Sequence, residues 1–437
     1  MSGMTAGLVG MAIMLVLMAG GMPVAIAMTL VGFVGTAFIY DWNWTAAIGI
    51  MGIEPYNRVS EFLFTTIPLF LLMGQFAHYS GISQEMYDTA RKWMGHWRGG
   101  LGVATVGACG GFAAASGSSI ATGAAMGTIT IPEMRKHGYS AKIATGVVAA
   151  GGTLGILIPP SVGMIIYALI ADQSIGRLFI AGIVPGIMLT IMFMLTVVIW
   201  AFIDPAAAPR SEKYSWSERL RSTSGVLGIT ILFIIVMGGI YTGIFTPTEA
   251  AAIGAVGSYL MVVVKKRSLC LPAVFSALIE AAQTTCMIFF IIIGSHILNV
   301  FLAATQTPAQ LSSFVGGLDL NAYLILAVII VIYLILGCFL DTLAMIVLTV
   351  PIFFPILINL GFDPIWFGVI VIIVMEMALI TPPVGMCIFV IKGVARDVPL
   401  STIFGGVWPF LIAQILAIVV LTAFPQLVLW LPAQMLD

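Results

Sequence analysis

The sequence predicts an all-α polytopic membrane protein, and three observations support this prediction. Of the 437 residues, 61% are apolar and only 8% are charged, whereas a soluble domain averages about 25% charged residues. Apolar stretches recur from end to end, which leaves room for many crossings of about 20 residues each. The net charge is −1, and this argues against a nucleic-acid partner, which needs a basic stripe. A soluble protein and a singly anchored protein are both excluded, and we expect a lipid bilayer around the chain.

Proline and glycine positions indicate that the chain consists of two halves of similar design. A shift of about 223 positions aligns prolines in order along the sequence. The aligned pairs are Pro23 with Pro247, Pro132 with Pro355, Pro159-Pro160 with Pro382-Pro383, and Pro185 with Pro409. We therefore predict a first repeat over 1–203, a polar cytoplasmic linker over 204–224 and a second repeat over 225–437.

Each half is predicted to contain the same elements in the same order. Two apolar helices come first, followed by a third helix, a short amphipathic segment, two apolar arms around a break, a helix interrupted by Pro-Pro, and a last helix. In the first half these are 4–20, 23–40, 62–80, 84–97, 101–116 with 120–134, 140–171 and 178–203. In the second half they are 226–243, 248–264, 273–300, 308–317, 321–338 with 342–358, 363–394 and 402–430.

The basic residues predict the topology of these helices. If the breaks at 116–119 and 337–342 are tips of re-entrant hairpins, each half makes five crossings. With the N-terminus outside, 15 of the 17 basic residues then lie inside, including Lys265, Lys266 and Arg267, and only Arg58 and Arg177 lie outside. Full crossings at the two breaks would remove this bias. Because five is odd, we predict two inverted repeats with about ten crossings, and N- and C-termini that are both periplasmic.

Inverted repeats, broken helices and re-entrant hairpins together are typical of a secondary transporter. Non-helical backbone at membrane depth is expected only where protein buries it or where it lines a cavity. Two symmetry-related breaks therefore predict one shared site near the midplane.

The first hairpin tip reads Ser116-Gly117-Ser118-Ser119. Small residues let the backbone turn and approach a ligand, and the hydroxyls and freed carbonyls are hard oxygen ligands suited to Na⁺. The amides that open the outgoing helix can hold a carboxylate. The alternative is that these serines and glycines only allow close helix packing.

The second tip runs from Gly337 to Thr342 and places Asp341 at the position that matches Ser118. An ionisable residue at membrane depth is a functional candidate by default. We predict that Asp341 coordinates a cation or lines the binding site. It could also cap the helix that follows, and both roles are compatible.

The two Pro-Pro segments supply the remaining candidates, which are Gly152, Thr153 and Pro159 in the first half and Thr381 and Pro382 in the second. Proline removes a backbone donor and clashes with the preceding turn. Two in succession predict unwinding that frees carbonyls to face an ion, although a purely structural kink is the alternative.

Other polar residues within apolar helices are weaker candidates, because lone polar residues there more often bond to neighbouring helices. They are Gln75, His78, His296, Asn299 and Glu376, of which Glu376 could be a proton or ion site. No P-loop, HExxH or GxSxG motif is present. We therefore expect no enzyme, no direct use of ATP and no cofactor, with Na⁺ as the coupling ion.

Several of these stretches resemble the large membrane subunit of the tripartite ATP-independent periplasmic (TRAP) transporters. Besides the first tip, they are GGTLGILIPPS at 151–161, FTPTEAAA at 245–252, DTLAMIVLTVPI at 341–352 and TPPVG at 381–385. They follow one another in order, and the resemblance extends over the whole chain.

The resemblance implies an elevator, in which the early helices of each half form a scaffold and the hairpins and broken helices form a transport domain. It implies Na⁺ between each tip and the opposing Pro-Pro helix. The residues concerned are Ser116, Ser118, Ser119, Gly152 and Thr153 on one side and Gly337, Asp341, Thr342, Thr381 and Pro382 on the other. Among these, Ser116, Ser119, Asp341 and Thr381 are the expected sodium ligands.

The resemblance further implies import of an organic acid, a carboxylate solute, across the bacterial inner membrane. A periplasmic substrate-binding protein would deliver the solute, and a separate small four-helix membrane subunit would complete the complex. A stand-alone sodium/dicarboxylate symporter of similar hairpin architecture is the alternative.

Overall fold

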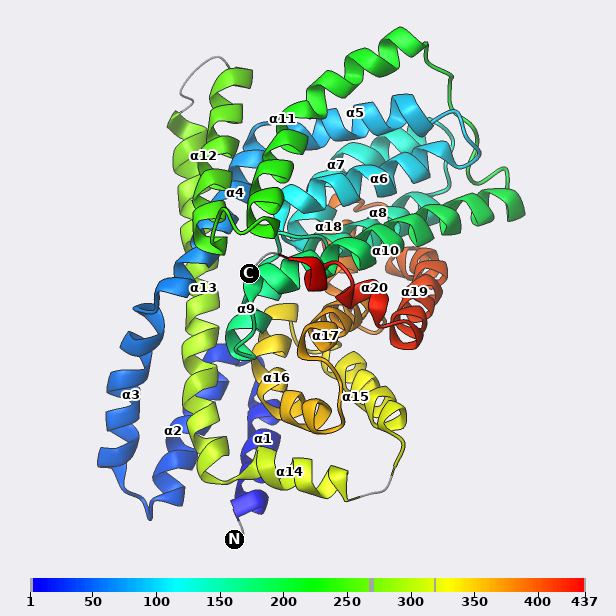
Figure 1. Ribbon diagram of the computed structural model, residues 1–437. Coiled ribbons are helices and arrows are strands. Elements are labelled where there is room, and N and C mark those ends of the chain that lie inside the picture. Colours follow the sequence, from blue (N-terminus) through cyan, green and yellow to red (C-terminus); the bar gives the residue numbers. More distant parts are fainter. Residues whose placement is uncertain (1–2, 267–270, 318–319, 436–437) are drawn as a thin grey trace.

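The computed structural model describes residues 3–266, 271–317 and 320–435, and within these ranges all regular elements are helices (Figure 1). Seven of the described helices are long and apolar enough to cross a membrane, or eight if the bent pair α8–α9 counts as one span. The all-α polytopic class is therefore confirmed. Three further predicted crossings, at 4–20, 23–40 and 363–394, contain apolar helices of 17, 16 and 15 residues. The inverted ten-crossing topology stays a prediction, and Arg267 lies outside the described residues.

The elements follow the predicted order with few exceptions. The first half contains α1 (Gly3–Ala19), α2 (Val24–Ile39), α3 (Trp44–Val59), α4 (Thr66–Tyr79), α5 (Ile82–Met94), α6 (Gly100–Ser116), α7 (Ser119–Lys136), α8 (Ala141–Leu157), α9 (Val162–Ile170) and α10 (Ile175–Ile203). The second half contains α11 (Trp216–Tyr241), α12 (Pro247–Lys266), α13 (Leu271–Ala304), α14 (Thr307–Gly316), α15 (Ala322–Leu336), α16 (Thr342–Asn359), α17 (Pro364–Ala378), α18 (Met386–Val394), α19 (Leu400–Ala423) and α20 (Gln426–Leu429).

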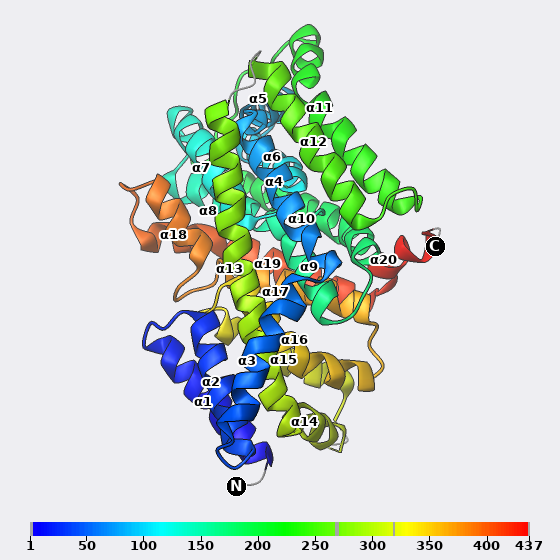
Figure 2. The same ribbon diagram turned by 90° about the vertical axis from the view of Figure 1, so that its left-hand side faces the viewer.

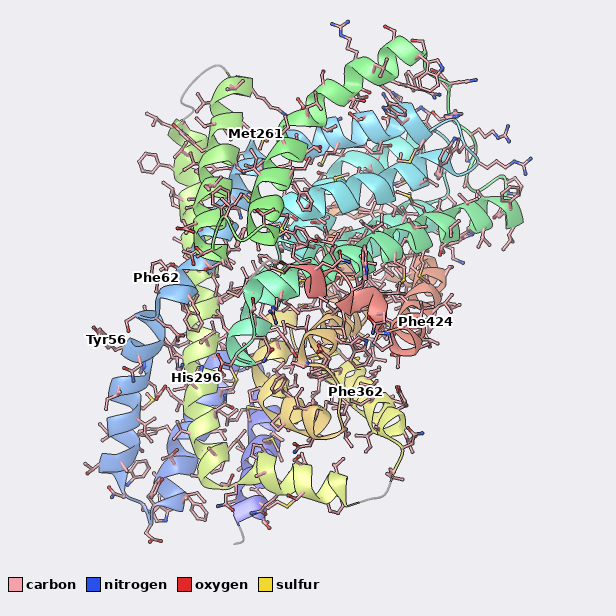
Figure 3. The ribbon with its side chains drawn as sticks, in the orientation of Figure 1. Tyr56, Phe62, Met261, His296, Phe362 and Phe424 are labelled. Carbon is pink, nitrogen blue, oxygen red and sulfur yellow. The ribbon has the colours of Figure 1, made fainter. Side chains whose placement is uncertain are left out.

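Helix α3 was not predicted, because its sequence interrupts apolar residues with Glu54, Pro55 and Arg58. The chain nevertheless forms a helix here, with the Asn43 side chain capping its start and an ion pair of 3.5 Å between Arg58 and Glu54. This helix stands at the left edge of the molecule and packs on α2 and α13 (Figure 1). Its outer face is left exposed, as the side chain labelled Tyr56 in Figure 3 illustrates.

Two predicted boundaries differ from the structure. Helix α11 starts at Trp216, inside the predicted linker, because Ser215 and Glu218 form a capping box that begins the helix early. The last long helix ends at Ala423 instead of extending to 430, because Pro425 follows and a short helix, α20, takes over.

The helices pack in two groups. The early helices of both halves pack together, with α13 against α2 and α4, and α12 against α4. Figure 2 shows α13 extending along the molecule beside α4 and α3. The hairpins and broken helices form the other group, in which α8 contacts α6, α7 and α19, while α9 contacts α16 and α18 contacts α7.

A polar contact at the helix ends connects the two halves of the chain within the second group of helices. Arg135, at the end of α7, donates a hydrogen bond of 2.6 Å to Asp397, which follows α18. This bond holds the pKa of the exposed Asp397 carboxyl below its usual range. The first hairpin is thus linked directly to a loop of the second half.

Helices α8 and α19 approach so closely that their backbones touch. A Cβ atom at Gly406 would collide with the carbonyl oxygen of Lys142 and lie 3.0 Å from the Cα atom of Gly146. A backbone carbonyl cannot move aside as the end of a flexible side chain can. Glycine is therefore required at this crossing.

We expect Gly406→Ala to separate α8 from α19 and to lower the melting temperature of the purified protein, since overpacking typically costs about 1–3 kcal/mol. Thermal unfolding in detergent measures this effect. The matched control is Gly393→Ala in α18, where a Cβ atom meets nothing within 4 Å. Equal melting temperatures for the two variants would contradict the packing argument.

Candidate functional site

The first hairpin turns sharply at Gly117 and Ser118, between α6 and α7. Gly117 has a φ of +60°, a left-handed conformation that favours glycine. The Ser118 side chain caps α7 by accepting a hydrogen bond of 3.4 Å from the backbone N–H of Ala121. The Ser116 and Thr122 hydroxyl oxygens lie 2.6 Å apart and bond to each other. Hydrogen bonds from the hairpin's own side chains thus stabilise the turn at the tip.

The second hairpin has the same plan between α15 and α16. Asp341 is the N-cap of α16, where its carboxylate accepts a hydrogen bond of 3.5 Å from the backbone N–H of Ala344. The capping role considered from the sequence is therefore present. Asp341 is only half-buried and Thr342 is buried, so the carboxylate remains available to a ligand.

Each tip packs on the Pro-Pro break of its own half. A Cβ atom at Gly117 would lie 2.8 Å from the carbonyl oxygen of Pro160, and one at Gly155 would collide with that of Ser118. In the second half, a Cβ atom at Gly337 would collide with Ala378, and the Cys338 thiol lies 3.8 Å from the carbonyl oxygen of Pro382. The structure thus brings together the stretches that the sequence had grouped.

Both tips line a single cavity of about 420 Å³. The first tip contributes Ser116, Gly117 and Ser118, and the second contributes Asp341 and Thr342. The opposite wall comes from α4 and α13, in the other group of helices. Its polar members are Gln75, His78, Glu280 and Thr284. The cavity therefore lies between the hairpins and the early helices.

The charges around this cavity are unusual for a site that would receive an organic acid. Its described lining contains the carboxylates of Asp341 and Glu280, the imidazole of His78, and neither lysine nor arginine. Positive potential comes instead from the backbone N–H groups at the starts of α7 and α16, because a helix N-terminus carries a partial positive charge.

The remaining predicted residues do not line this cavity. Gly152, Thr153 and Pro159 are buried in the first broken helix, and Gly337 and Pro382 pack behind the second tip. The Thr381 hydroxyl donates to the carbonyl oxygen of Met377 at 2.7 Å. Ser119 is fully buried, and its hydroxyl donates to Glu376. The four expected sodium ligands are thus divided, with Ser116 and Asp341 at the cavity and Ser119 and Thr381 outside its lining.

Of the weaker candidates, Gln75 and His78 line the cavity, whereas His296 and Asn299 lie elsewhere on α13, with His296 on its lower part in Figure 3. Sequence reasoning missed Glu280, which accepts a hydrogen bond of 2.7 Å from the Tyr79 hydroxyl. A signal was present, since Glu280 is an ionisable residue inside a long apolar helix.

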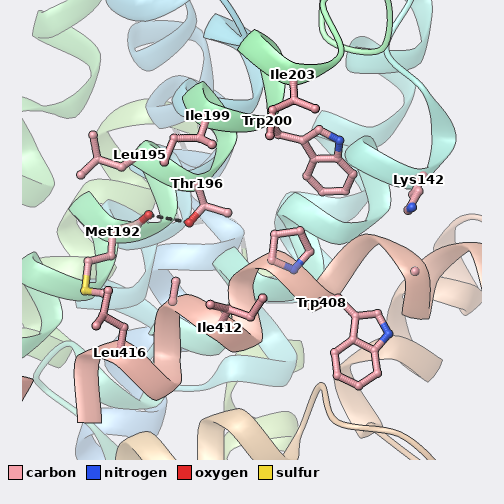
Figure 4. A pocket seen from close by; sticks show the side chains of 13 residues that line it. Lys142, Met192, Leu195, Thr196, Ile199, Trp200, Ile203, Trp408, Ile412 and Leu416 are labelled. Atoms are coloured by element: carbon pink, nitrogen blue, oxygen red, sulfur yellow. Dashed lines mark hydrogen bonds between the residues drawn. The ribbon is translucent and has the colours of Figure 1, made fainter. Parts of the chain in front are cut away.

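A larger cavity, of about 720 Å³, lies between α10 and α19 (Figure 4). Its lining side chains are mainly apolar, and Lys142 is the charged one. Several lining residues, such as Ile199, Trp408 and Ile412, are exposed on the outer surface. It contains none of the breaks. We therefore assign the functional site to the smaller cavity at the two tips.

The sequence model of the DctM component of the tripartite ATP-independent periplasmic transporters matches residues 11–427. The chain belongs to this family. It is 39% identical over 382 residues to the C4-dicarboxylate TRAP transporter large permease protein DctM of Pseudomonas aeruginosa, covering 87% of this chain and 89% of the relative. It is 32% identical over 434 residues to the protein of the same name from Rhodobacter capsulatus, covering 96% and 97%.

The fold of this DctM family member is also found in a solved membrane transporter. The crystal structure of the Alcanivorax borkumensis YdaH transporter superposes with a TM-score of 0.67 at 14% identity, covering 88% of this chain and 89% of the other. At this identity the likeness concerns the fold alone. The expectation of a multi-pass transporter subunit is confirmed, and the relatives are permeases, not enzymes.

The close contact between the first tip and the first broken helix can be tested by mutation. We expect Gly155→Ala to displace Ser118 and to reduce transport strongly, because its Cβ atom would overlap the Ser118 carbonyl group. Uptake of solute into vesicles that contain the reconstituted transporter measures the effect. The control is Gly123→Ala on α7, which is part of the first hairpin. A Cβ atom at Gly123 would be 3.9 Å from the nearest atom. Wild-type uptake by Gly155→Ala would refute the proposed role of this contact.

Proposed function

We propose that the chain is the permease subunit of a sodium-driven importer, which accepts an organic acid from a periplasmic binding protein and releases it inside the cell. The observation that supports this most directly is the cavity between the two hairpin tips. It offers two helix N-termini and hydroxyl groups together with two carboxylates, Asp341 and Glu280. Such a lining suits an anion only when cations enter with it.

Each helix N-terminus supplies about half a positive charge, so α7 and α16 together offset about one negative charge. A dicarboxylate next to Asp341 would leave several negative charges uncompensated in a poorly hydrated space, which is strongly unfavourable. Sodium at the tips would remove this excess, with Ser116, Ser118, Asp341 and freed backbone carbonyls as hard oxygen ligands. Solute and ion binding would then depend on each other.

The position of the cavity supports an elevator. One wall belongs to the hairpins and the other to α4 and α13, so a solute would sit at the boundary between the two helix groups. Once ions and solute together are nearly neutral, the hairpin group could slide past the early helices without exposing net charge to lipid. In this proposal both chain termini are periplasmic and the membrane is the bacterial inner membrane.

The partners follow from the family. A tripartite transporter has two further components, which we propose to be a separate four-helix membrane subunit and the periplasmic binding protein. C4-dicarboxylates are the first solutes to test, because the two relatives compared above carry that name. A stand-alone symporter would differ by transporting without the binding protein.

Reconstitution tests this function. We expect vesicles with both membrane subunits to accumulate a labelled C4-dicarboxylate only when an inward sodium gradient and the binding protein are both present. A potassium gradient of equal size controls for osmotic and electrical effects. Full uptake without sodium would contradict the proposal, and full uptake without the binding protein would favour the stand-alone symporter.

A second test removes the charge at the second tip. Asn caps a helix about as well as Asp, so Asp341→Asn should keep α16 intact while lowering apparent sodium affinity by roughly 10- to 100-fold or more, since even the loss of a residue that only supports a metal ligand costs that much. Sodium titration of uptake measures this change. Asp363→Asn is the matched control, since Asp363 caps α17 and does not line the cavity. An unchanged sodium titration for Asp341→Asn would exclude this carboxylate as a determinant of coupling.

A further inference from the structure

Four polar side chains form a second cluster, behind the first tip and wholly inside the protein. They are Ser119 on α7, Thr153 on α8, Glu376 on α17 and Gln414 on α19, and each has an exposed fraction of 0%. None of them lines the cavity at the tips. Two belong to the first half and two to the second, so the cluster lies where the halves meet.

Hydrogen bonds connect the four residues. Ser119 Oγ donates to Glu376 Oε1 at 2.7 Å and lies 3.2 Å from the carbonyl oxygen of Thr153. Gln414 Nε2 donates to Thr153 Oγ1 at 3.4 Å. Because a serine hydroxyl has one proton, Ser119 can satisfy only one of its two acceptors at a time.

Two oxygen atoms in this cluster are left over. Glu376 Oε2 and Gln414 Oε1 are buried and have no hydrogen-bond partner among the described residues. While Glu376 is ionised, both oxygen atoms are acceptors, so they cannot satisfy each other. An ionised carboxylate that is fully buried, and whose side-chain hydrogen bond comes from a single serine hydroxyl, is unstable unless a positive group compensates it. None of the ion pairs among the described residues involves Glu376.

We propose that this cluster is a binding site for one monovalent cation. Its ligands are Glu376 Oε2, Gln414 Oε1 and the carbonyl oxygen of Thr153, all of them hard oxygen atoms. One monovalent ion neutralises the single carboxylate, whereas a divalent ion would leave a net positive charge in the core. We take the ion to be sodium, and in this respect the inference rests on the proposed function.

The site is separate from the tips but connected to them. Ser119 follows Ser118, which lines the cavity, and its hydroxyl holds Glu376 in place. An ion between Glu376, Gln414 and Thr153 therefore fastens the first hairpin to α17 and α19 of the other half. Occupancy of this ion site therefore determines how strongly the first tip is bound to the second half.

Equilibrium binding of radioactive sodium to the purified complex tests this inference. We expect Glu376→Gln, which keeps the shape and removes the charge, to bind one sodium ion fewer per chain than the wild type. Gln414→Leu should bind the same number with an affinity for one ion lowered about tenfold or more. The Gln414→Leu variant provides a second measurement of the site if Glu376→Gln fails to fold. Thr130→Val is the control, because the Thr130 hydroxyl is also fully buried and unpaired but stands apart from this cluster.

The outcomes separate the two proposals. Full sodium binding by both Glu376→Gln and Gln414→Leu overturns the buried site, and a water molecule or a proton then occupies it, while sodium-driven import still stands. Loss of one ion in Glu376→Gln together with sodium-independent uptake supports the buried site and overturns the proposed function. Absence of sodium binding by the wild type overturns both.

Discussion

Backbone that leaves its helix inside a membrane protein must find hydrogen-bond partners within the protein, and the rest of this structure depends on how that constraint is met. Small residues solve it here. Gly155 lets α8 touch the carbonyl group of Ser118, and Gly337 lets the second tip touch α17. Ser118 and Asp341 cap the outgoing helices. Larger residues at the two glycines would push the tips away from the breaks and out of the shared cavity.

The same arrangement determines the electrostatics of the cavity. Because both outgoing helices begin at the tips, their N–H groups supply positive potential where lysine or arginine would otherwise be needed. A fixed cationic side chain would hold an anion whether or not an ion was bound. In our proposal, helix ends combined with Asp341 and Glu280 bind an anion weakly alone and better with a cation. Such a dependence is what the proposed ion-coupled importer requires, and it would make a carboxylate solute compatible with an acidic cavity.

The sequence was sufficient to predict the helical class, the order of the elements, and the two tips with their breaks, because glycine and proline mark such positions through local geometry. It could not reveal which tip residues face the cavity. Successive residues of a helix point about 100° apart, so Ser118 faces the cavity while Ser119 faces Glu376, and only the packing of α7 determines that rotation. Glu280 could have been found as an ionisable residue inside an apolar helix, but its position at the cavity depends on the packing of α13 and could not be read from the sequence. Helix α3 escaped prediction because tertiary contacts stabilise a segment whose composition is mixed.

The position of Glu376 in the repeat gives the buried cluster its significance. Glu376 stands 223 positions after Thr153, the same shift that aligns the two halves. Equivalent places in the two broken helices thus hold a hydroxyl in one half and a carboxyl group in the other, and the structure places both residues in one network through Ser119. Two carboxylates there would repel each other, and two hydroxyls would attract no cation. One of each gives a single negative charge at the junction of the halves, which in our proposal one monovalent ion neutralises while it holds the first hairpin against the second half.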